Sequence, residues 1–267
     1  MSLAKTKARH ILSALNIDRP ELLTHLKEVC CERGAYVREG ELDGAEARLI
    51  VSGDRGIITV NSNNSSAART RFSIAHELGH FELHRERSTS LLCDQRDLND
   101  WRMKRRQENL EEDANEFASE LLMPEAFIKA EIDVAKPSIG FLEKLAERYQ
   151  TSLFATTRRF MDLTPKACAA VFFKESHILY SWRSAFFMEQ NYRFADKLQP
   201  YSYAHDASLG IATPNYMCEV EANLWLKVPG WLRGELLLEQ SRFFSGLGIG
   251  MALLWLVDGP LTSRLLD

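Results

Sequence analysis

The chain has 267 residues, of which 45% are hydrophobic, and a formal net charge of −4. This length can bury a full core and leaves room for two domains, while the slight acidity excludes a general electrostatic attraction to nucleic acid. The five cysteines are odd in number and contain no Cys-x-x-Cys pair, which argues for a reducing compartment and against a cysteine metal site. No stretch approaches 18 apolar residues, so we expect a cytoplasmic protein that does not enter a membrane.

The first part of the chain predicts two short helices followed by two strands. The helices are expected over Ala8–Leu15 and Glu21–Cys31, the second opened by Pro20. The strands are expected over Ala47–Ser52 and Gly56–Asn61, because the glycine-containing residues between them are typical of a β-hairpin.

The most informative segment is His76-Glu77-Leu78-Gly79-His80. Histidines four residues apart lie on one side of a helix, because four steps of about 100° overshoot a full turn by only about 40°. Both imidazoles can therefore bind one metal ion, and the carboxylate of Glu77 can reach a metal-bound water as a general base. The alternative is a surface helix with two histidines by chance, yet composition predicts fewer than about 0.03 such pentapeptides.

The helix around this segment is apolar on nearly every side, which predicts a central helix with its site in a cleft. Gly79 lowers helix stability by up to about 1 kcal/mol. We therefore expect it where another backbone comes close, and the second metal-bearing helix is the candidate neighbour.

His84 extends the row of histidines by four more residues. Three histidines at this spacing climb about 12 Å along a helix, too far for all of them to bind one zinc ion at bond lengths near 2 Å. We interpret His84 as a packing residue or as a hydrogen-bonding partner of a metal ligand.

A catalytic zinc site needs a third protein ligand, and the candidates lie in Leu110–Pro124, whose apolar residues form one helical stripe. Glu111 shares the inward face with that stripe and is the favoured ligand, with the other acidic residues as alternatives. Asp113 is either an acceptor for a ligating histidine or an exposed acid. The opposite face carries three acids that are most simply solvated charges without partners: Glu112, Glu116 and Glu120.

The two segments together resemble the ImmA/IrrE family of metallopeptidases. The resemblance rests on the residues from Arg71 to His80 and on the pattern Glu111-x-Asp-Ala-Asn115-x-Phe-Ala118 before Leu121-Leu122-Met123-Pro124. It covers about residues 20–165. It implies a zincin-like fold with Zn²⁺, or alternatively Mn²⁺, on His76, His80 and Glu111, and with Glu77 as the base. Asp113 departs from the Glu that the family often has at this position.

This family acts in bacteria and phages on helix-turn-helix repressors. The resemblance therefore implies an intracellular zinc endopeptidase that cuts an XRE-type helix-turn-helix transcriptional repressor in a stress or phage-immunity response. The alternative class is a non-hydrolytic, metal-containing regulator that binds DNA or protein. Extended substrates of zincin-like sites pair with an edge strand beside the metal helix, so Ile57–Val60 is a candidate substrate edge, with an ordinary strand as an equal alternative.

Residues 85–109 are rich in arginine and lysine and show little apolar periodicity. We interpret this basic segment as a solvated connection, with a lid or a repressor contact as the alternative.

Two helical patterns separated by a polar turn follow within Pro137–Met161, which predicts a helix-turn-helix segment. Only Arg158 and Arg159 decorate the second helix, which is too few cations for strong phosphate affinity. We therefore favour packing or repressor docking over DNA binding for this segment.

After Pro165 the pattern changes to strands. A hairpin is expected from Ala169–Lys174 and Ile178–Arg183, and later strands over Asn223–Val228, Gly234–Gln240 and Met251–Val257. Four of the five tryptophans fall here, and a tryptophan-rich core explains them better than a small-molecule pocket.

The predicted fold class is α+β in three parts. A zincin-like metallopeptidase domain is expected over residues 1–130 and the helix-turn-helix extension over residues 131–164. A C-terminal α+β domain of sensor or scaffold type, similar to a GAF-like module, is expected over residues 165–267.

Overall fold

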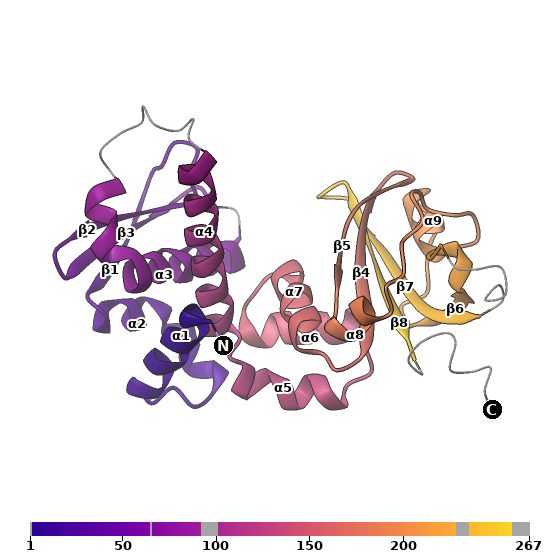
Figure 1. Ribbon diagram of the computed structural model, residues 1–267, viewed down its shortest axis with the longest axis horizontal. Coiled ribbons are helices and arrows are strands. Elements are labelled where there is room, and N and C mark those ends of the chain that lie inside the picture. Colours follow the sequence, from indigo (N-terminus) through magenta and orange to yellow (C-terminus); the bar gives the residue numbers. More distant parts are fainter. Residues whose placement is uncertain (1, 65, 92–100, 228–234, 258–267) are drawn as a thin grey trace. The chain divides into compact units, whose positions relative to one another are not determined.

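The computed structural model describes residues 2–64, 66–91, 101–227 and 235–257, with the backbone alone for 86–91 and 101–108. The chain has the predicted α+β fold and divides into two compact units (Figure 1). The first unit is Met1–Ile128 with Ala146–Ala155, and the second is Lys129–Leu145 with Thr156–Asp267. The segment expected as a helix-turn-helix is thus divided between them.

The first unit contains a three-stranded sheet in the order β1-β3-β2. Its strands are β1 Ala35–Gly40, β2 Ala47–Ser52 and β3 Arg55–Asn61. The antiparallel β2–β3 hairpin is the predicted one, with Ser52 opposite Arg55. The sequence analysis missed β1, which pairs in parallel with β3. Only Ala35 of β1 is fully buried, so this strand lacks the regular alternation that reveals a half-buried strand.

The prediction that Ile57–Val60 forms an edge for a substrate is wrong. These residues lie in β3, whose two sides are already paired with β1 and β2. Ile58 and Val60 are also buried in the core of the unit. The edge strands of this sheet are β1 and β2.

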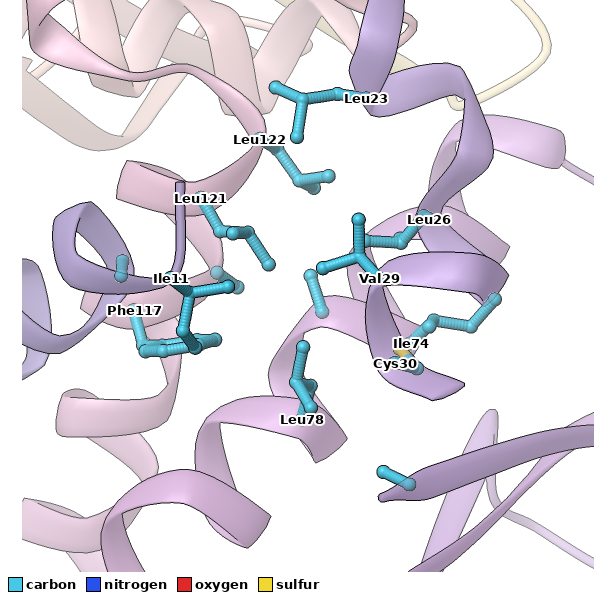
Figure 2. Packing of buried hydrophobic residues seen from close by; sticks show 14 of the residues in the cluster. Ile11, Leu23, Leu26, Val29, Cys30, Ile74, Leu78, Phe117, Leu121 and Leu122 are labelled. Atoms are coloured by element: carbon cyan, nitrogen blue, oxygen red, sulfur yellow. The ribbon is translucent and has the colours of Figure 1, made fainter. Parts of the chain in front are cut away.

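Helices build the rest of the first unit. They are α1 Leu3–Ala14, the 3-10 helix η1 Pro20–His25, α2 Leu26–Glu32, α3 Ala67–Leu91 and α4 Trp101–Leu122. Figure 2 shows apolar side chains of α1, α2, α3 and α4 directed into one interior, among them Ile11, Val29, Leu78 and Phe117. Complete burial of such a side chain stabilises the fold by about 1.5–3 kcal/mol. The core therefore fixes the relative positions of α3 and α4.

Two of the acids expected to be solvated have partners on α1, so that expectation is wrong for them. The Glu120 side chain is fully buried and accepts a hydrogen bond from Arg9 Nε at 2.8 Å. A Glu116 carboxylate oxygen lies 3.9 Å from Lys5 Nζ. These pairs join residues more than 100 positions apart, because α1 covers this face of α4. The helical pattern of one segment cannot reveal such a cover.

The second unit contains a five-stranded antiparallel sheet in the order β5-β4-β8-β7-β6. Its strands are β4 Ala167–Lys174, β5 His177–Arg183, β6 Cys218–Glu221, β7 Leu236–Phe244 and β8 Ile249–Leu256. The predicted β4–β5 hairpin is confirmed. The strand predicted over Asn223–Val228 is wrong, because β6 ends at Glu221 and a 3-10 turn, η2 Ala222–Leu224, follows; Val228 lies outside the described residues.

Helices cover both faces of this sheet. They are α6 Ile139–Tyr149, α7 Leu153–Leu163, α8 Ala185–Glu189 and α9 Tyr203–Ser208, with α5 Glu125–Val134 crossing between the units. On one face, Phe173 packs with Phe187 of α8, Ala204 of α9 and the buried Trp225. That burial agrees with a tryptophan in the core.

The other face of the sheet contacts the second-unit parts of α6 and α7. The backbone N–H of Ile139 donates to Gln240 Oε1 at 2.7 Å, and Thr157 Oγ1 lies 3.9 Å from Met251 Sδ. The side chain of Arg159, one of the two arginines on the second helix, is buried. Arg158 is exposed, pairs with Asp162 and lies over the ring of Trp182. The second-unit parts of the two helices therefore pack against this face of the sheet.

Candidate metal centre

The two helices that carry the expected metal ligands meet at Gly79 of α3. A Cβ atom at this position would lie 3.0 Å from Phe117 Cδ1 and 3.2 Å from both the Cα and the carbonyl oxygen of Ala114 in α4. The expectation that Gly79 faces the second metal-bearing helix is confirmed. His76 lies three residues before Gly79, and Glu111 lies three residues before Ala114. The close approach of the two helices therefore brings the side chains of His76 and Glu111 together.

The side chains of His76, His80 and Glu111 converge on one point. His76 Nε2 and His80 Nε2 are 3.0 Å apart. Glu111 Oε2 lies 3.1 Å from His76 Nε2, and Glu111 Oε1 lies 3.3 Å from His80 Nε2. Among the described residues this is the group of histidine, cysteine and acidic side chains whose ligand atoms, all within 4.8 Å of one another, could hold a metal ion.

These distances fit a single small ion. Zinc with nitrogen and oxygen ligands at 2.0–2.2 Å in a tetrahedron separates neighbouring ligand atoms by about 3.3–3.6 Å. The 3.0 Å between the two imidazole nitrogens is slightly below that value, and each nitrogen lies 3.1 or 3.3 Å from a different oxygen of the Glu111 carboxylate. Two imidazoles and one carboxylate are also a donor set that zinc accepts in catalytic sites. The residues present therefore fit a metal ion of this kind.

Burial tunes the ionisation of the site. It lowers the pKa of His80 to about 4, and the charge of the neighbouring His76 adds to this effect. At neutral pH His80 is thus uncharged and its lone pair is available to a metal. Burial, followed by the negative charge of Glu111, raises the pKa of Glu77 to about 7. A carboxylate with such a pKa is suited to accept and return protons near neutral pH.

Asn115 is a part of the site that the sequence analysis did not single out. Its Oδ1 lies 3.0 Å from His76 Nδ1. An amide oxygen only accepts hydrogen bonds, so His76 carries its proton on Nδ1 and presents the lone pair of Nε2 to Glu111. The available signal was its spacing, since Asn115 lies one helical turn after Glu111 on the same face.

His84 is a hydrogen-bonding partner of a candidate ligand and stands apart from the ligand group. It is buried, and its Nδ1 lies 3.1 Å from His80 Nδ1, on the side of the His80 ring away from His76. Asp113 Oδ2 lies 3.7 Å from His84 Nε2. Asp113 therefore faces His84, and its side chain is half exposed. The sequence analysis considered it either as an acceptor for a ligating histidine or as an exposed acid.

The basic segment over residues 85–109 cannot be assigned a role from contacts. Its side chains from position 86 to 108 lie outside those that the structure describes, although the backbone extends α3 to Leu91 and begins α4 at Trp101.

A helix pair with two histidines and a glutamate on adjoining turns defines a metallopeptidase-like class of domain. Residues 32–161 match the family model of Peptidase M78, described as an IrrE N-terminal-like domain. The resemblance to the ImmA/IrrE metallopeptidases is thereby confirmed over this part of the chain.

The chain also shares its fold with a solved structure. A Mycobacterium tuberculosis transcriptional regulator superposes with a TM-score of 0.60 at 16% sequence identity, covering 94% of this chain and 75% of that one. Among curated proteins no match is found. None of the helices in the described part of the chain combines the length and apolar character needed to cross a membrane.

Proposed function

We propose that this protein is a zinc-dependent metalloendopeptidase that cuts an XRE-type helix-turn-helix repressor in a stress or phage-immunity response. The observation that carries the proposal is the convergence of His76, His80 and Glu111 within reach of a single ion, with the half-buried carboxylate of Glu77 next to His76 in the chain. Zinc is the ion that best suits this donor set, with manganese as the alternative.

The residues of the chain divide the work of peptide hydrolysis between them. His76, His80 and Glu111 would hold the ion, which supplies polarisation of the scissile carbonyl and of the attacking water. Glu77 takes the proton of that water and passes it to the leaving amine. Its raised pKa makes the first transfer easier than it would be for an ordinary glutamate, because a carboxylate of higher pKa is a stronger base.

The edge that would receive an extended substrate is β2 rather than β3. β2 is an edge strand that packs against α3, and Ser73 of α3 donates a hydrogen bond to Glu46, the residue before β2, at 3.0 Å. A peptide added to the free side of β2 would therefore run beside the helix that carries His76 and His80.

A protein partner is supported over DNA by the second helix of the helix-turn-helix segment. A recognition helix needs exposed side chains that reach bases and phosphates. Arg159 of α7 is buried, and Arg158 is engaged by Asp162 and Trp182. We therefore propose that the protein acts on a repressor and does not itself read DNA.

The direct test is a cleavage assay with the zinc-loaded protein and a repressor encoded beside its gene, repeated with a peptide library derived from the proteome. We expect cleavage by the wild-type protein and a loss of at least about 100-fold in Glu77→Gln, because a general base is removed. Glu77→Gln should retain its zinc, since Glu77 is not a ligand. Cleavage that persists in this variant, or zinc lost from it, contradicts the assignment.

The same preparations separate the two classes of function. Salt-dependent DNA binding by the wild-type protein, with neither the repressor nor any library peptide cut, would favour the non-hydrolytic regulator.

A further inference from the structure

Each candidate histidine ligand directs Nε2 toward the ligand group and Nδ1 away from it. Whether Nδ1 carries the proton determines whether Nε2 can bind a metal. A neutral imidazole has one N–H and one lone pair, so binding through Nε2 requires the proton on Nδ1. For His76 the acceptor oxygen of Asn115 secures this arrangement. For His80 the partner of Nδ1 is another imidazole nitrogen, Nδ1 of His84 at 3.1 Å.

A contact between two imidazole nitrogens can run in either direction. If His84 donates, His80 Nδ1 accepts and its own proton sits on Nε2, where it blocks the metal. If His84 accepts, His80 carries its proton on Nδ1 and the lone pair of Nε2 points to His76 and Glu111. The tautomer of His84 thus decides whether Nε2 of His80 carries a proton and cannot bind the metal, or has a lone pair that can bind it; below, His80 is called open in the second case.

Asp113 lies near the nitrogen of His84 that carries the proton when His80 is open. Its carboxylate is 3.7 Å from His84 Nε2, which is longer than a hydrogen bond, and its negative charge favours the proton of His84 on Nε2 and a lone pair on Nδ1. The His84 side chain is only 5% exposed and that of Asp113 51%, so bulk water competes little for the contact of His84 with His80 and more for its contact with Asp113. α4 therefore supplies the ligand Glu111 and, two residues later, the carboxylate that orients His84.

We propose that His84 is a positioning residue for metal binding, which accepts the Nδ1 proton of His80 and is itself oriented by Asp113. The inference rests on the metal site of the proposed function and names residues that act on it. His84 does not serve as a fourth ligand, because its Nδ1 faces the outer nitrogen of His80 and not the point where Nε2 of His76 and His80 meet.

The test compares two variants that differ in one acceptor. His84→Asn keeps an oxygen near the position of Nδ1, whereas His84→Leu fills similar space without an acceptor. Zinc affinity, measured by competition with a chromophoric chelator, should fall by about 10–100-fold in His84→Leu, as expected for loss of a partner of a ligating histidine. It should stay within a few-fold of wild type in His84→Asn. Asp113→Asn should give a smaller loss, since its contact is longer.

A second readout follows the proton of His80 in the zinc-loaded protein, where Nε2 is occupied by the metal. Nitrogen-15 and N–H proton spectra of the imidazoles should show the Nδ1–H of His80 hydrogen-bonded and protected from exchange in the wild type and in His84→Asn, and without an acceptor in His84→Leu. Thermal unfolding of all variants checks that they are folded. Equal losses of affinity in both His84 variants would mean that packing matters and the acceptor does not, and unchanged affinity in both would also overturn the proposal.

The two readouts keep this inference separate from the proposed function. A wild-type protein that binds zinc but cuts no peptide would defeat the proposed function and leave the inference standing. Zinc affinity that does not distinguish His84→Leu from His84→Asn, or a wild-type protein that binds no zinc, would overturn the inference.

Discussion

Each unit of the molecule has a cluster of polar groups, and the two clusters differ in whether donors and acceptors match. In the second unit Glu239 of β7 is buried and faces donors. It accepts hydrogen bonds from the backbone N–H of Ala204 at 2.7 Å, from Trp225 Nε1 at 2.8 Å and from Ser241 Oγ at 2.6 Å. In the first unit the nitrogens of His76 and His80 and the oxygens of Glu111 face one another. When both histidines carry their protons on Nδ1, only acceptors meet there.

The difference shows how to separate a structural cluster from a functional one. Burial raises the pKa of Glu239 as it raises that of Glu77, so a perturbed pKa alone would select both. The donors around Glu239 complete its hydrogen bonds within the protein. The lone pairs that converge at His76, His80 and Glu111 lack such completion from one another and fit a cation instead.

The largest effect is expected from removing one of the converging acceptors. Glu111→Ala should lower zinc affinity by more than about 100-fold, because a lost ligand costs more than the roughly 10–100-fold lost with a ligand's partner. Chelator competition measures this. The neighbouring Glu112→Ala is the matched control, since its side chain lies about 100° away on the helix, and it should leave affinity unchanged. If Glu112→Ala is the variant that loses zinc, the reading of this helix face is wrong.

Removing the acceptor of the second unit should affect stability instead. Glu239→Leu would leave the donors of Ala204, Trp225 and Ser241 without their partner, at about 1–3 kcal/mol for each buried group that stays unpaired. Denaturant unfolding should show a loss of several kcal/mol for this unit, with zinc affinity unchanged. The exposed Glu219 on β6 provides a control, and Glu219→Leu should change stability by less than about 0.5 kcal/mol. A fall in zinc affinity in Glu239→Leu would show that the clusters are not independent.

A smaller effect is expected where α3 and α4 touch. Gly79→Ala places a methyl group 3.2 Å from backbone atoms of Ala114, so the helices have to separate. We expect a loss of about 1–3 kcal/mol, typical of overpacking, together with weaker zinc binding, because the ligands sit on both helices. Gly140→Ala meets no atom within 4 Å in α6, and it should be neutral or stabilising by up to about 1 kcal/mol. Equal behaviour of both variants would remove the argument for close packing at Gly79.

Local patterns in the sequence predicted the features that depend on local geometry. The spacing of His76, Glu77 and His80 follows from the helical repeat, and the β2–β3 and β4–β5 hairpins follow from short turns. The pattern of one helix was also enough to place Glu111 on the inward face of its helix. The same holds for the prediction that another backbone lies close to Gly79. The pairing of the two helices was expected from Gly79, which indicated a close neighbour, and from the need for a third metal ligand, and the family resemblance implied the same pairing.

The features that were missed depend on contacts between distant segments. The ion pair of Glu120 with Arg9 spans 111 positions, and an acid on a polar helix face looks the same in sequence whether water or an arginine meets it. β1 was missed because its partner β3 lies about 20 residues later and its own side chains alternate poorly. Asn115 carried no charge to attract attention, although its amide fixes the proton of His76.

The order of the strands in the first sheet also has a consequence for how the chain folds. β3 lies between β1 and β2 although it follows both in sequence, so β1 and β2 never touch. The β2–β3 hairpin has a tight turn with Ser52 opposite Arg55, and such hairpins form within about 1–10 μs. β1 pairs with β3 only when a longer loop has closed, which costs more chain entropy. We therefore expect the β2–β3 hairpin to form first and β1 to be added later. Slowing the pairing of β1 with β3 should then prolong the lifetime of a folding species in which β2 and β3 are paired and β1 is not.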